Sequence, residues 1–304
     1  MTDKKMLTLC IPTNGVLEWV FPVLDSIYMQ GVDEALFEVV VTDNGKNELF
    51  EQGMREYEEK YANLIYRKTT AYEFMNQVEA FNLVNGEFVK FINHRSKLIP
   101  GKLQEMIDFV KENRDEKPVT FFSNGNLIGL GCKMEFESFD EFVRGLSYYS
   151  SWSGGLAFWS EDFDKGKIRE EYNTLFPHTD ILFTKRDGNK YIINNDVVFE
   201  DIPVNGISKG KYKLFNAFAV EFVSVILDLY RNGNIKIETF EKVKKENLSF
   251  VASLYFDYVI RKKECSYDVS GAKKYINIFY STFQLNRELV GVIISRLFCK
   301  LKLK

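Results

Sequence analysis

The chain has 304 residues, enough for one large domain or about two ordinary ones. Hydrophobic residues make up 45% and charged residues 27%, which is typical of a globular protein with a full core. The net charge of −3 argues against a general nucleic-acid binder, because such a protein needs a basic face. Four widely spaced cysteines without a CxxC pattern predict neither a zinc site nor a disulfide framework, and they favour reduced thiols in the cytosol.

Apolar runs alternate with helical patterns from residue 5 to residue 123. The predicted strands are residues 6–11, 37–42, 63–67, 87–92 and 118–123, and the predicted helices are 17–28, 48–61, 72–84 and 100–113. Strands that alternate with helices at this pace predict βαβ units and a parallel sheet with right-handed crossovers.

The pattern is less regular after residue 123 and becomes helical from about residue 211. Edge strands are predicted within 127–135, a short helix at 138–145, strands at 156–159, 191–194 and 197–199, and a helix at 173–187. Long helices are predicted at 215–231, 237–261 and 271–304. We therefore expect an α/β domain over residues 1–210 and a C-terminal all-helical region over 211–304.

An ordered set of short motifs resembles the family 2 glycosyltransferases with the GT-A fold. The motifs are residues 9–14 (LCIPTN), 39–45 (VVVTDNG), Asn76 and Ala80 before 86–91 (GEFVKF), and 98–101 (LIPG). The resemblance covers about residues 6–110 and implies a Rossmann-like, mostly parallel sheet flanked by helices. It implies a nucleotide-binding half at about 1–123 and an acceptor half at about 124–210.

The resemblance implies that the polar turns after the first two strands hold the nucleotide. It assigns Pro12, Thr13, Asn14 and Asp43 to nucleotide-sugar binding, together with Asn76. An aspartate can accept a hydrogen bond from a base imide or a ribose hydroxyl. A tight turn after the second strand is the alternative explanation for the same residues.

The segment Asn93-His94-Arg95-Ser96 departs from the family. Family members carry an aspartate-rich motif here, which binds a divalent cation that bridges the donor diphosphate. Aligned to Pro100, those acids fall on His94, Arg95 and Ser96. A hard cation requires oxygen ligands, so we expect no divalent metal here unless a magnesium or manganese site is rebuilt elsewhere. Asn93, His94 and Arg95 are predicted donor-binding residues.

Three interpretations of this segment stay open. In the first, Arg95, helped by Lys97 or His94, replaces the metal as the cation that faces the leaving nucleoside diphosphate. In the second, the site is inactive and the protein is a sugar-nucleotide-binding, glycan-binding or scaffold relative. In the third, Arg95 and Lys97 are solvated surface charges and the alignment is shifted by one residue.

An inverting sugar transfer needs a base for the proton of the acceptor hydroxyl. The family places a carboxylate near the start of a helix in its second half, and residues 177–180 (PHTD) are similar to that helix start. Asp180 is the first candidate and His178 the second, with Glu161 and Asp162 as a fallback pair. Capping of the helix is the alternative explanation for Asp180.

Trp152, Gly154 and Gly155 are predicted to bind the acceptor. An aromatic ring packs on the apolar face of a sugar, and glycine lets a backbone approach a ligand closely. Core packing explains Trp152 equally well.

The last segment, residues 289–304, is apolar and then basic. A helix on an anionic membrane surface has this composition, and so does a core helix with a solvated basic end.

The function expected from the resemblance is sugar transfer by a hexosyltransferase-like enzyme. The donor would be a nucleotide-sugar, with a UDP-sugar favoured, and the acceptor a glycan or a lipid-linked glycan in surface polysaccharide biosynthesis. We expect inversion, independence of metal, no nucleic-acid partner, and a location in the cytoplasm or on the cytoplasmic face of the membrane.

Overall fold

The computed structural model describes residues 4–129, 131–163, 165, 172–203 and 210–302, with side chains up to residue 297. The chain divides into two compact units. Residues 1–142 and 150–203 belong to the first unit, and residues 143–149 and 204–304 belong to the second.

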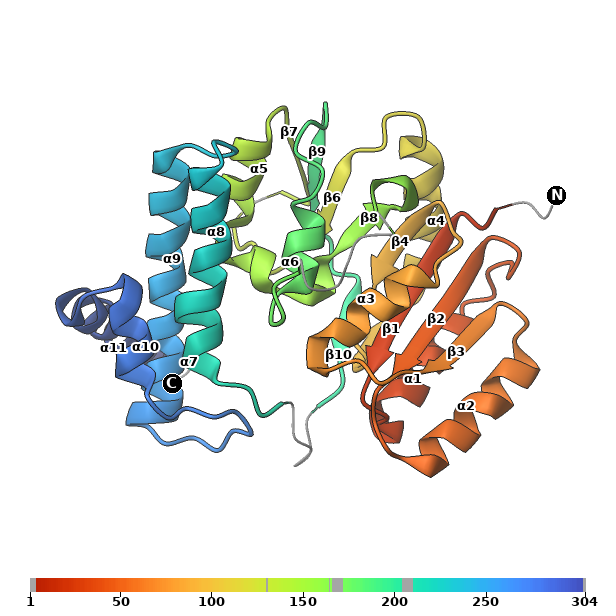
Figure 1. Ribbon diagram of the computed structural model, residues 1–304, viewed down its shortest axis with the longest axis horizontal. Helices are drawn as coiled ribbons and strands as arrows, with labels where there is room; N and C mark the ends of the chain where they lie inside the picture. Colours follow the sequence, from red (N-terminus) through yellow and green to blue (C-terminus); the bar gives the residue numbers. More distant parts are fainter. Residues whose placement is uncertain (1–3, 130, 164, 166–171, 204–209, 303–304) are drawn as a thin grey trace. The chain divides into compact units, whose positions relative to one another are not determined.

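The first unit is built on a five-stranded sheet with the strand order β3-β2-β1-β4-β8 (Figure 1). Its strands are β1 (Leu7–Thr13), β2 (Phe37–Asp43), β3 (Leu64–Lys68), β4 (Phe88–Phe91) and β8 (Ala157–Trp159). The first four are parallel, and β8 runs antiparallel to β4. This architecture confirms the predicted α/β fold class with a mostly parallel sheet flanked by helices.

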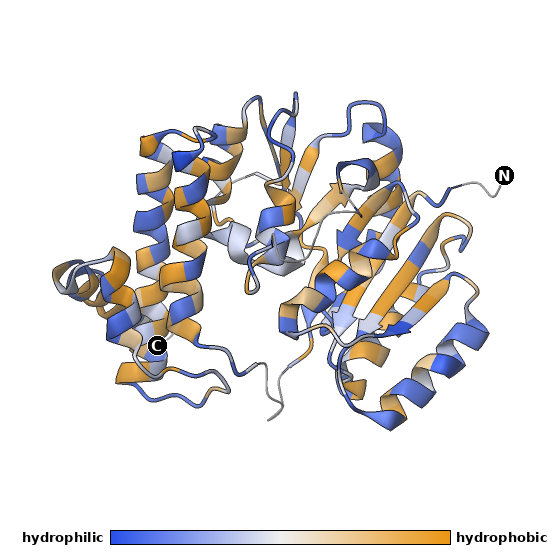
Figure 2. Cartoon of the chain, viewed as in Figure 1, coloured by the Kyte–Doolittle hydropathy of each residue, from blue (hydrophilic) through white to orange (hydrophobic). Residues whose placement is uncertain are grey.

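Helices cover both faces of this sheet. Its helices are α1 (Leu17–Tyr28), α2 (Glu48–Lys60), α3 (Asn76–Asn82, after the 3-10 turn Glu73–Met75) and α4 (Lys102–Asn113). One core cluster joins Leu9 of β1 to side chains of α1, α2 and α4. On the other face, Phe81 of α3 packs edge-on against Phe91 and Phe158, with ring centroids 6.4 and 5.2 Å apart. Burial on both faces explains why β1 and β2 consist mostly of apolar residues, which appear orange in Figure 2.

The strand predicted at 118–123 does not extend the parallel sheet. It forms β6 (Val119–Phe122), which pairs parallel with β9 (Tyr191–Asn194) in a separate three-stranded sheet completed by β7 (Lys133–Phe136). The physical reason is that β8 already occupies the free edge of β4. Phe121 is joined to Leu156, just before β8, by a single bridge.

Three other local predictions are corrected. The helix predicted at 173–187 is only α6 (Pro177–Leu182), and the strand predicted at 197–199 is β10 (Phe199–Asp201). The polar segment after β4 contains a short strand, β5 (Ser96–Leu98), which pairs antiparallel with β10. Strands of three residues have too short a pattern to be seen in a sequence.

The second unit is helical, as predicted. Its helical segments are α7 (Leu214–Asn216), the π-helical turn Ala217–Glu221, α8 (Phe222–Arg231), α9 (Ile237–Tyr255), the π-helical turn Phe256–Ile260, α10 (Ala272–Phe279) and α11 (Thr282–Lys302). Helix α5 (Phe139–Leu146) contains residues of both units. Within the described residues, no helix is long and apolar enough to cross a membrane.

The single helix predicted at 271–304 is two helices. Tyr280 is extended, with φ −132° and ψ 144°, and a capping box starts α11 just after it. The Gln284 amide donates to Ser281 Oγ (3.2 Å), and the Ser281 amide donates to Gln284 Oε1 (2.7 Å).

Candidate functional site

Strand polarity brings the predicted site segments to one edge of the main sheet. β1, β2 and β4 are parallel, so Thr13, Asp43 and the segment 92–95 all follow the same carboxyl edge. β8 is antiparallel to β4, so the residues just before β8, including 152–156, start at that edge too. Ligands of open α/β sheets bind at this edge.

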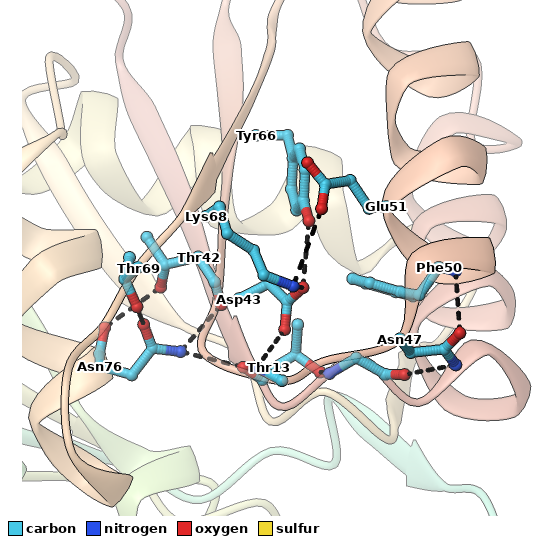
Figure 3. Close-up of polar contacts among 12 residues, drawn as sticks. Thr13, Thr42, Asp43, Asn47, Phe50, Glu51, Tyr66, Lys68, Thr69 and Asn76 are labelled. Carbon is cyan, nitrogen blue, oxygen red and sulfur yellow. Dashed lines mark hydrogen bonds and ion pairs between the residues drawn. The ribbon is translucent and has the colours of Figure 1, made fainter.

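Asp43 is fully buried and accepts three hydrogen bonds from two segments (Figure 3). Oδ1 accepts from the Gly45 amide (2.6 Å), and Oδ2 accepts from the Tyr66 hydroxyl (3.0 Å) and Lys68 Nζ (2.8 Å). Burial and the carboxylate of Asp43 raise the pKa of Tyr66, which keeps the phenol a donor. Asp43 therefore joins the turn after β2 to the end of β3, and Lys68 is the partly exposed group of this network.

Asn76, at the start of α3, links the ends of β1 and β2. Its amide nitrogen donates to the carbonyls of Thr13 (3.0 Å) and Thr42 (2.9 Å), and its oxygen accepts from Thr69 Oγ1 (2.8 Å). Both amide hydrogens are used inside the protein (Figure 3). The contribution of Asn76 to the site is thus to fix the two strand ends.

Thr13 and His94 lie 81 positions apart in sequence and are in contact. Thr13 Oγ1 and His94 Nδ1 are 2.9 Å apart, and the Gly15 amide donates to the same hydroxyl (3.1 Å). The half-buried His94 ring packs edge-on against Trp19, with centroids 5.0 Å apart. Burial first, and then the charge of Arg95, lower the pKa of His94 to about 4, so the imidazole is neutral at pH 7.

Pro12 and Asn14 border this contact. Pro12 is half-buried and Asn14 is exposed. A Cβ built on Gly45 would lie 2.0 Å from the Asn14 carbonyl oxygen. The turn after β2 therefore requires glycine to pack on the turn after β1.

Arg95 is held by a carboxylate that sequence reasoning did not include. Nη2 of Arg95 donates to Asp201 Oδ2 (2.9 Å), and Nη1 donates to the Ile202 carbonyl (3.2 Å). Ser96 Oγ donates to the other oxygen of Asp201 (2.6 Å), and Asn93 Oδ1 accepts from the Arg95 amide (3.2 Å). The guanidinium is 20% exposed, so it is a positioned cation and not a freely solvated one.

Lys97 has a different environment from Arg95. It lies 3.6 Å from Glu200, a pair with both side chains exposed. Pairs of this kind contribute little to stability. Lys97 is therefore a solvated surface charge, as the third interpretation of this segment predicts for it.

Close packing accounts for both predicted acceptor glycines. A Cβ on Gly154 would lie 2.6 Å from the Trp152 ring, and a Cβ on Gly155 would lie 2.0 Å from the Phe121 ring. Trp152 itself is half-buried, 6.5 Å from Phe121 between ring centroids. The glycines let Trp152 fold back over its own segment, whereas contact with an acceptor stays a prediction.

A fully buried lysine fastens the same segment to the sheet. Nζ of Lys90, in β4, donates to the carbonyls of Phe91 (2.8 Å), Gly154 (2.6 Å) and Leu156 (3.3 Å). Burial lowers the pKa of Lys90 well below its usual range. In the sequence, Lys90 stands out as the single charged residue inside the apolar run 88–92.

His178 is buried, and both of its ring nitrogens have partners. Nε2 lies 2.9 Å from the Ser151 carbonyl, and Nδ1 lies 3.2 Å from Gln77 Oε1. Burial lowers the pKa of His178 to about 4, against the opposing effect of the Ser151 carbonyl. A neutral imidazole that donates through Nε2 to the Ser151 carbonyl connects α6 to the segment before β8.

Asp180 lies in α6 and is half-buried. Its Oδ2 accepts from the Asn173 amide (2.6 Å), so it stabilises the loop that leads into α6. Thr179 Oγ1 donates to the Ser150 carbonyl (2.9 Å), which anchors the helix just before Asp180.

The fallback pair lies at the opposite edge of the sheet. Because β8 is antiparallel, Glu161 and Asp162 follow its end beside the start of β4. Glu161 pairs there with Lys117, and Asp162 lies 3.6 Å from Lys185. These acids are thus excluded as a base at the carboxyl edge.

Among the described residues, no group of three or more histidines, cysteines, aspartates and glutamates is arranged to hold a metal ion. At the segment after β4, the described carboxylate is that of Asp201, which already pairs with Arg95.

The sequence matches no model of a known protein family. It also matches no curated protein.

Solved structures with the same fold include two that hold sugar nucleotides. TarS 1–349 from S. aureus in complex with UDP-GlcNAc has a TM-score of 0.60 and 15% identity, over 90% of this chain and 79% of that one. The mannosyltransferase PcManGT from Pyrobaculum calidifontis, in complex with GDP-Man and Mn²⁺, has a TM-score of 0.53 and 16% identity, over 96% and 88%. This chain spans only 44% of a longer TarS structure. At these identities the likeness establishes the fold.

Proposed function

We propose that the protein is a glycosyltransferase that binds a nucleotide-sugar donor at the carboxyl edge of β1, β2 and β4. The observation that carries the proposal is the position of Arg95, a held but partly exposed cation next to the Thr13–His94 contact. Its fold is that of structures crystallised with UDP, UDP-GlcNAc and GDP-Man. Membership of family 2 belongs to the proposal.

Arg95 stabilises the leaving nucleoside diphosphate. When the bond between the anomeric carbon and the β-phosphate oxygen breaks, the electron pair stays on that oxygen. A guanidinium presents several N–H donors in a plane and stays charged at any working pH, so it can offset this charge. Asp201 keeps the guanidinium oriented through Nη2.

The residues present after β4 do not fit a magnesium or manganese site. Such ions require several oxygen ligands, whereas this segment offers the Asn93 amide oxygen, a hydroxyl and an imidazole, and the nearby carboxylate of Asp201 already pairs with Arg95.

Asp180 is the proposed base. The acceptor hydroxyl attacks the anomeric carbon from the face opposite the leaving group, and its proton passes to the carboxylate of Asp180. His178 is assigned a positioning role, because both of its nitrogens already have partners. Attack from the face opposite the leaving group inverts the configuration of the anomeric carbon.

A UDP-sugar is the favoured donor, and a glycan or a lipid-linked glycan is the favoured acceptor. Surface polysaccharide assembly on the cytoplasmic side of the membrane is the setting we propose. Trp152 would provide a ring for a sugar face at the acceptor position.

Release of nucleoside diphosphate from UDP-GlcNAc and other sugar nucleotides tests this proposal. We expect wild-type protein to release it slowly in EDTA, with water replacing the acceptor, and Asp180→Asn to lose turnover at least about 100-fold while it still binds the donor. Asp228→Asn, an exposed aspartate of α8, is the matched control. Complete loss of turnover in EDTA that Mn²⁺ restores would contradict the metal-free mechanism.

A non-catalytic sugar-nucleotide-binding relative is the second candidate. The observation in its favour is that the acids of the family motif are absent from 93–96 while Asp43 is buried. This candidate predicts donor binding with no release of nucleoside diphosphate in either EDTA or Mn²⁺, and no effect of Asp180→Asn.

A further inference from the structure

Helix α11 is apolar on two faces, of which only one is covered. Leu285 and Leu289 are buried, and α11 packs on α9. Between 40% and 76% of the side chain is exposed at Phe283, Val290, Ile293, Ile294 and Leu297. A surface helix of a globular protein normally has a single apolar face, so the second one requires an explanation.

The exposed apolar residues lie on one side of the helix and are here called the outer stripe (Phe283, Val290, Ile293, Ile294, Leu297). Helical residues turn by about 100° each, so the five positions i, i+7, i+10, i+11 and i+14 fall within roughly 100° of one another. Of the buried leucines, Leu285 lies on the other side of the helix and Leu289 lies at the border between the two faces. Measured along the axis, the outer stripe is about 21 Å long.

Basic residues accompany the outer stripe, and acids are absent from its C-terminal half. Arg287 is exposed beside it and pairs with Glu288 (3.2 Å), and Lys300 and Lys302 follow its last residue in the sequence. Residues 289–304 contain arginine and lysine but neither aspartate nor glutamate.

The basic character extends to the turn after α9. Asp257 is shared by Arg296 (2.9 Å), Lys263 (3.1 Å) and Arg261 (3.7 Å), so three cations surround one carboxylate. Lys262, between two of them, is exposed. This cluster keeps an excess of positive charge beside α11.

We propose that α11 lies on an anionic lipid surface, with the outer stripe in the interface and the basic residues at the lipid phosphates. An apolar row bordered by lysine and arginine is the composition of a helix that lies in a membrane plane. Anionic headgroups attract such a border. The insertion is shallow, in keeping with the finding that no described helix could span a bilayer.

A second copy of the chain is a poorer occupant of the outer stripe. An antiparallel contact between two α11 helices would bring Arg287 of one copy to the basic end of the other. Residues 289–304 contain no acid to offset the repulsion, and Glu288 already pairs with Arg287 (3.2 Å).

Flotation of the full chain with vesicles tests the proposal. We expect binding to phosphatidylcholine vesicles that contain phosphatidylglycerol, weaker binding to phosphatidylcholine alone, and a decrease with salt. The double variant Val290→Asp/Leu297→Asp should lose at least about tenfold in partitioning. Leu49→Asp is the control, since Leu49 is 70% exposed in the first turn of α2, where an acid is favourable.

A charge variant separates the two contributions. Lys300→Glu/Lys302→Glu leaves the outer stripe intact and should abolish the preference for phosphatidylglycerol. Flotation of both double variants at the wild-type level would overturn the proposal. So would a wild-type dimer in sedimentation that Val290→Asp/Leu297→Asp dissociates, with no flotation of the wild type.

Discussion

His94 and His178 are the two histidines of the chain, and burial lowers the pKa of each to about 4. The unfolded chain therefore binds more protons than the folded one between about pH 4 and 6.5. Their stabilising contribution is complete above about pH 6.5 and is lost as the pH falls toward 4. Each histidine should remove about 1.4 kcal/mol of stability per pH unit within this window.

Proton NMR titration of the folded protein checks this prediction, with His178→Gln identifying the two ring signals. We expect both rings to titrate below about pH 5. A midpoint near 6.5 for either ring would show that the side chain is solvated and not held as described.

Asp43 allows a second prediction at the scale of single residues. Asp43→Ala removes three hydrogen bonds of a buried carboxylate and frees Lys68 to reach solvent. We expect a loss of about 2–3 kcal/mol in the free energy of unfolding. Asp228→Ala, at an exposed position, should change it by less than about 0.5 kcal/mol. Equal urea midpoints for the two variants would contradict the assigned role.

The family resemblance and the alternation of strands with helices were enough to predict that Thr13, Asp43 and Arg95 follow the carboxyl ends of strands in one sheet. They were not enough to predict Asp201 as the partner of Arg95, because that contact joins residues 106 positions apart. Lys90 was visible in the sequence as the lone charged residue of 88–92. Its three carbonyl partners were not, because they depend on where the segment before β8 lies.

At the scale of elements, the segment before β8 is constrained by side-chain volume. The Cβ of Gly155→Ala would lie 2.0 Å from the Phe121 ring, so ring or backbone must move. We expect a cost of about 1–3 kcal/mol and weaker acceptor use. Gly291→Ala in α11, where no atom lies within 4 Å of the added Cβ, should instead be neutral or stabilising. Thermal unfolding of the two variants distinguishes these effects, and equal midpoints would contradict the packing argument.

The elements that the sequence predicted well are those with long local patterns. β1, β2 and β4 are apolar runs between amphipathic helices, and their order along the chain determines parallel pairing. The sheet of β6 and the pairing of β5 with β10 rest on contacts between distant residues. The break before α11 had a local signal, Ser281 with Gln284, that the apolar periodicity of 271–304 obscured.

At the scale of the whole molecule, one unit carries the candidate sugar-nucleotide site and the other carries the outer stripe. A cation at the carboxyl edge of the first unit is the central claim, and binding of nucleoside diphosphates tests it most directly. Isothermal titration in EDTA with UDP, GDP, CDP and dTDP should show at least one of them binding to the wild type. Arg95→Ala should weaken that binding about 30-fold, the equivalent of about 2 kcal/mol for a charged hydrogen bond.

Lys97→Ala is the matched control, since Lys97 follows Arg95 by two positions but pairs with Glu200 at the surface. The affinity of the Lys97→Ala variant for the same diphosphate should stay within about threefold of the wild-type affinity. An Arg95→Ala variant that binds as tightly as wild type would contradict the claim, as would a wild-type protein that binds none of the four diphosphates.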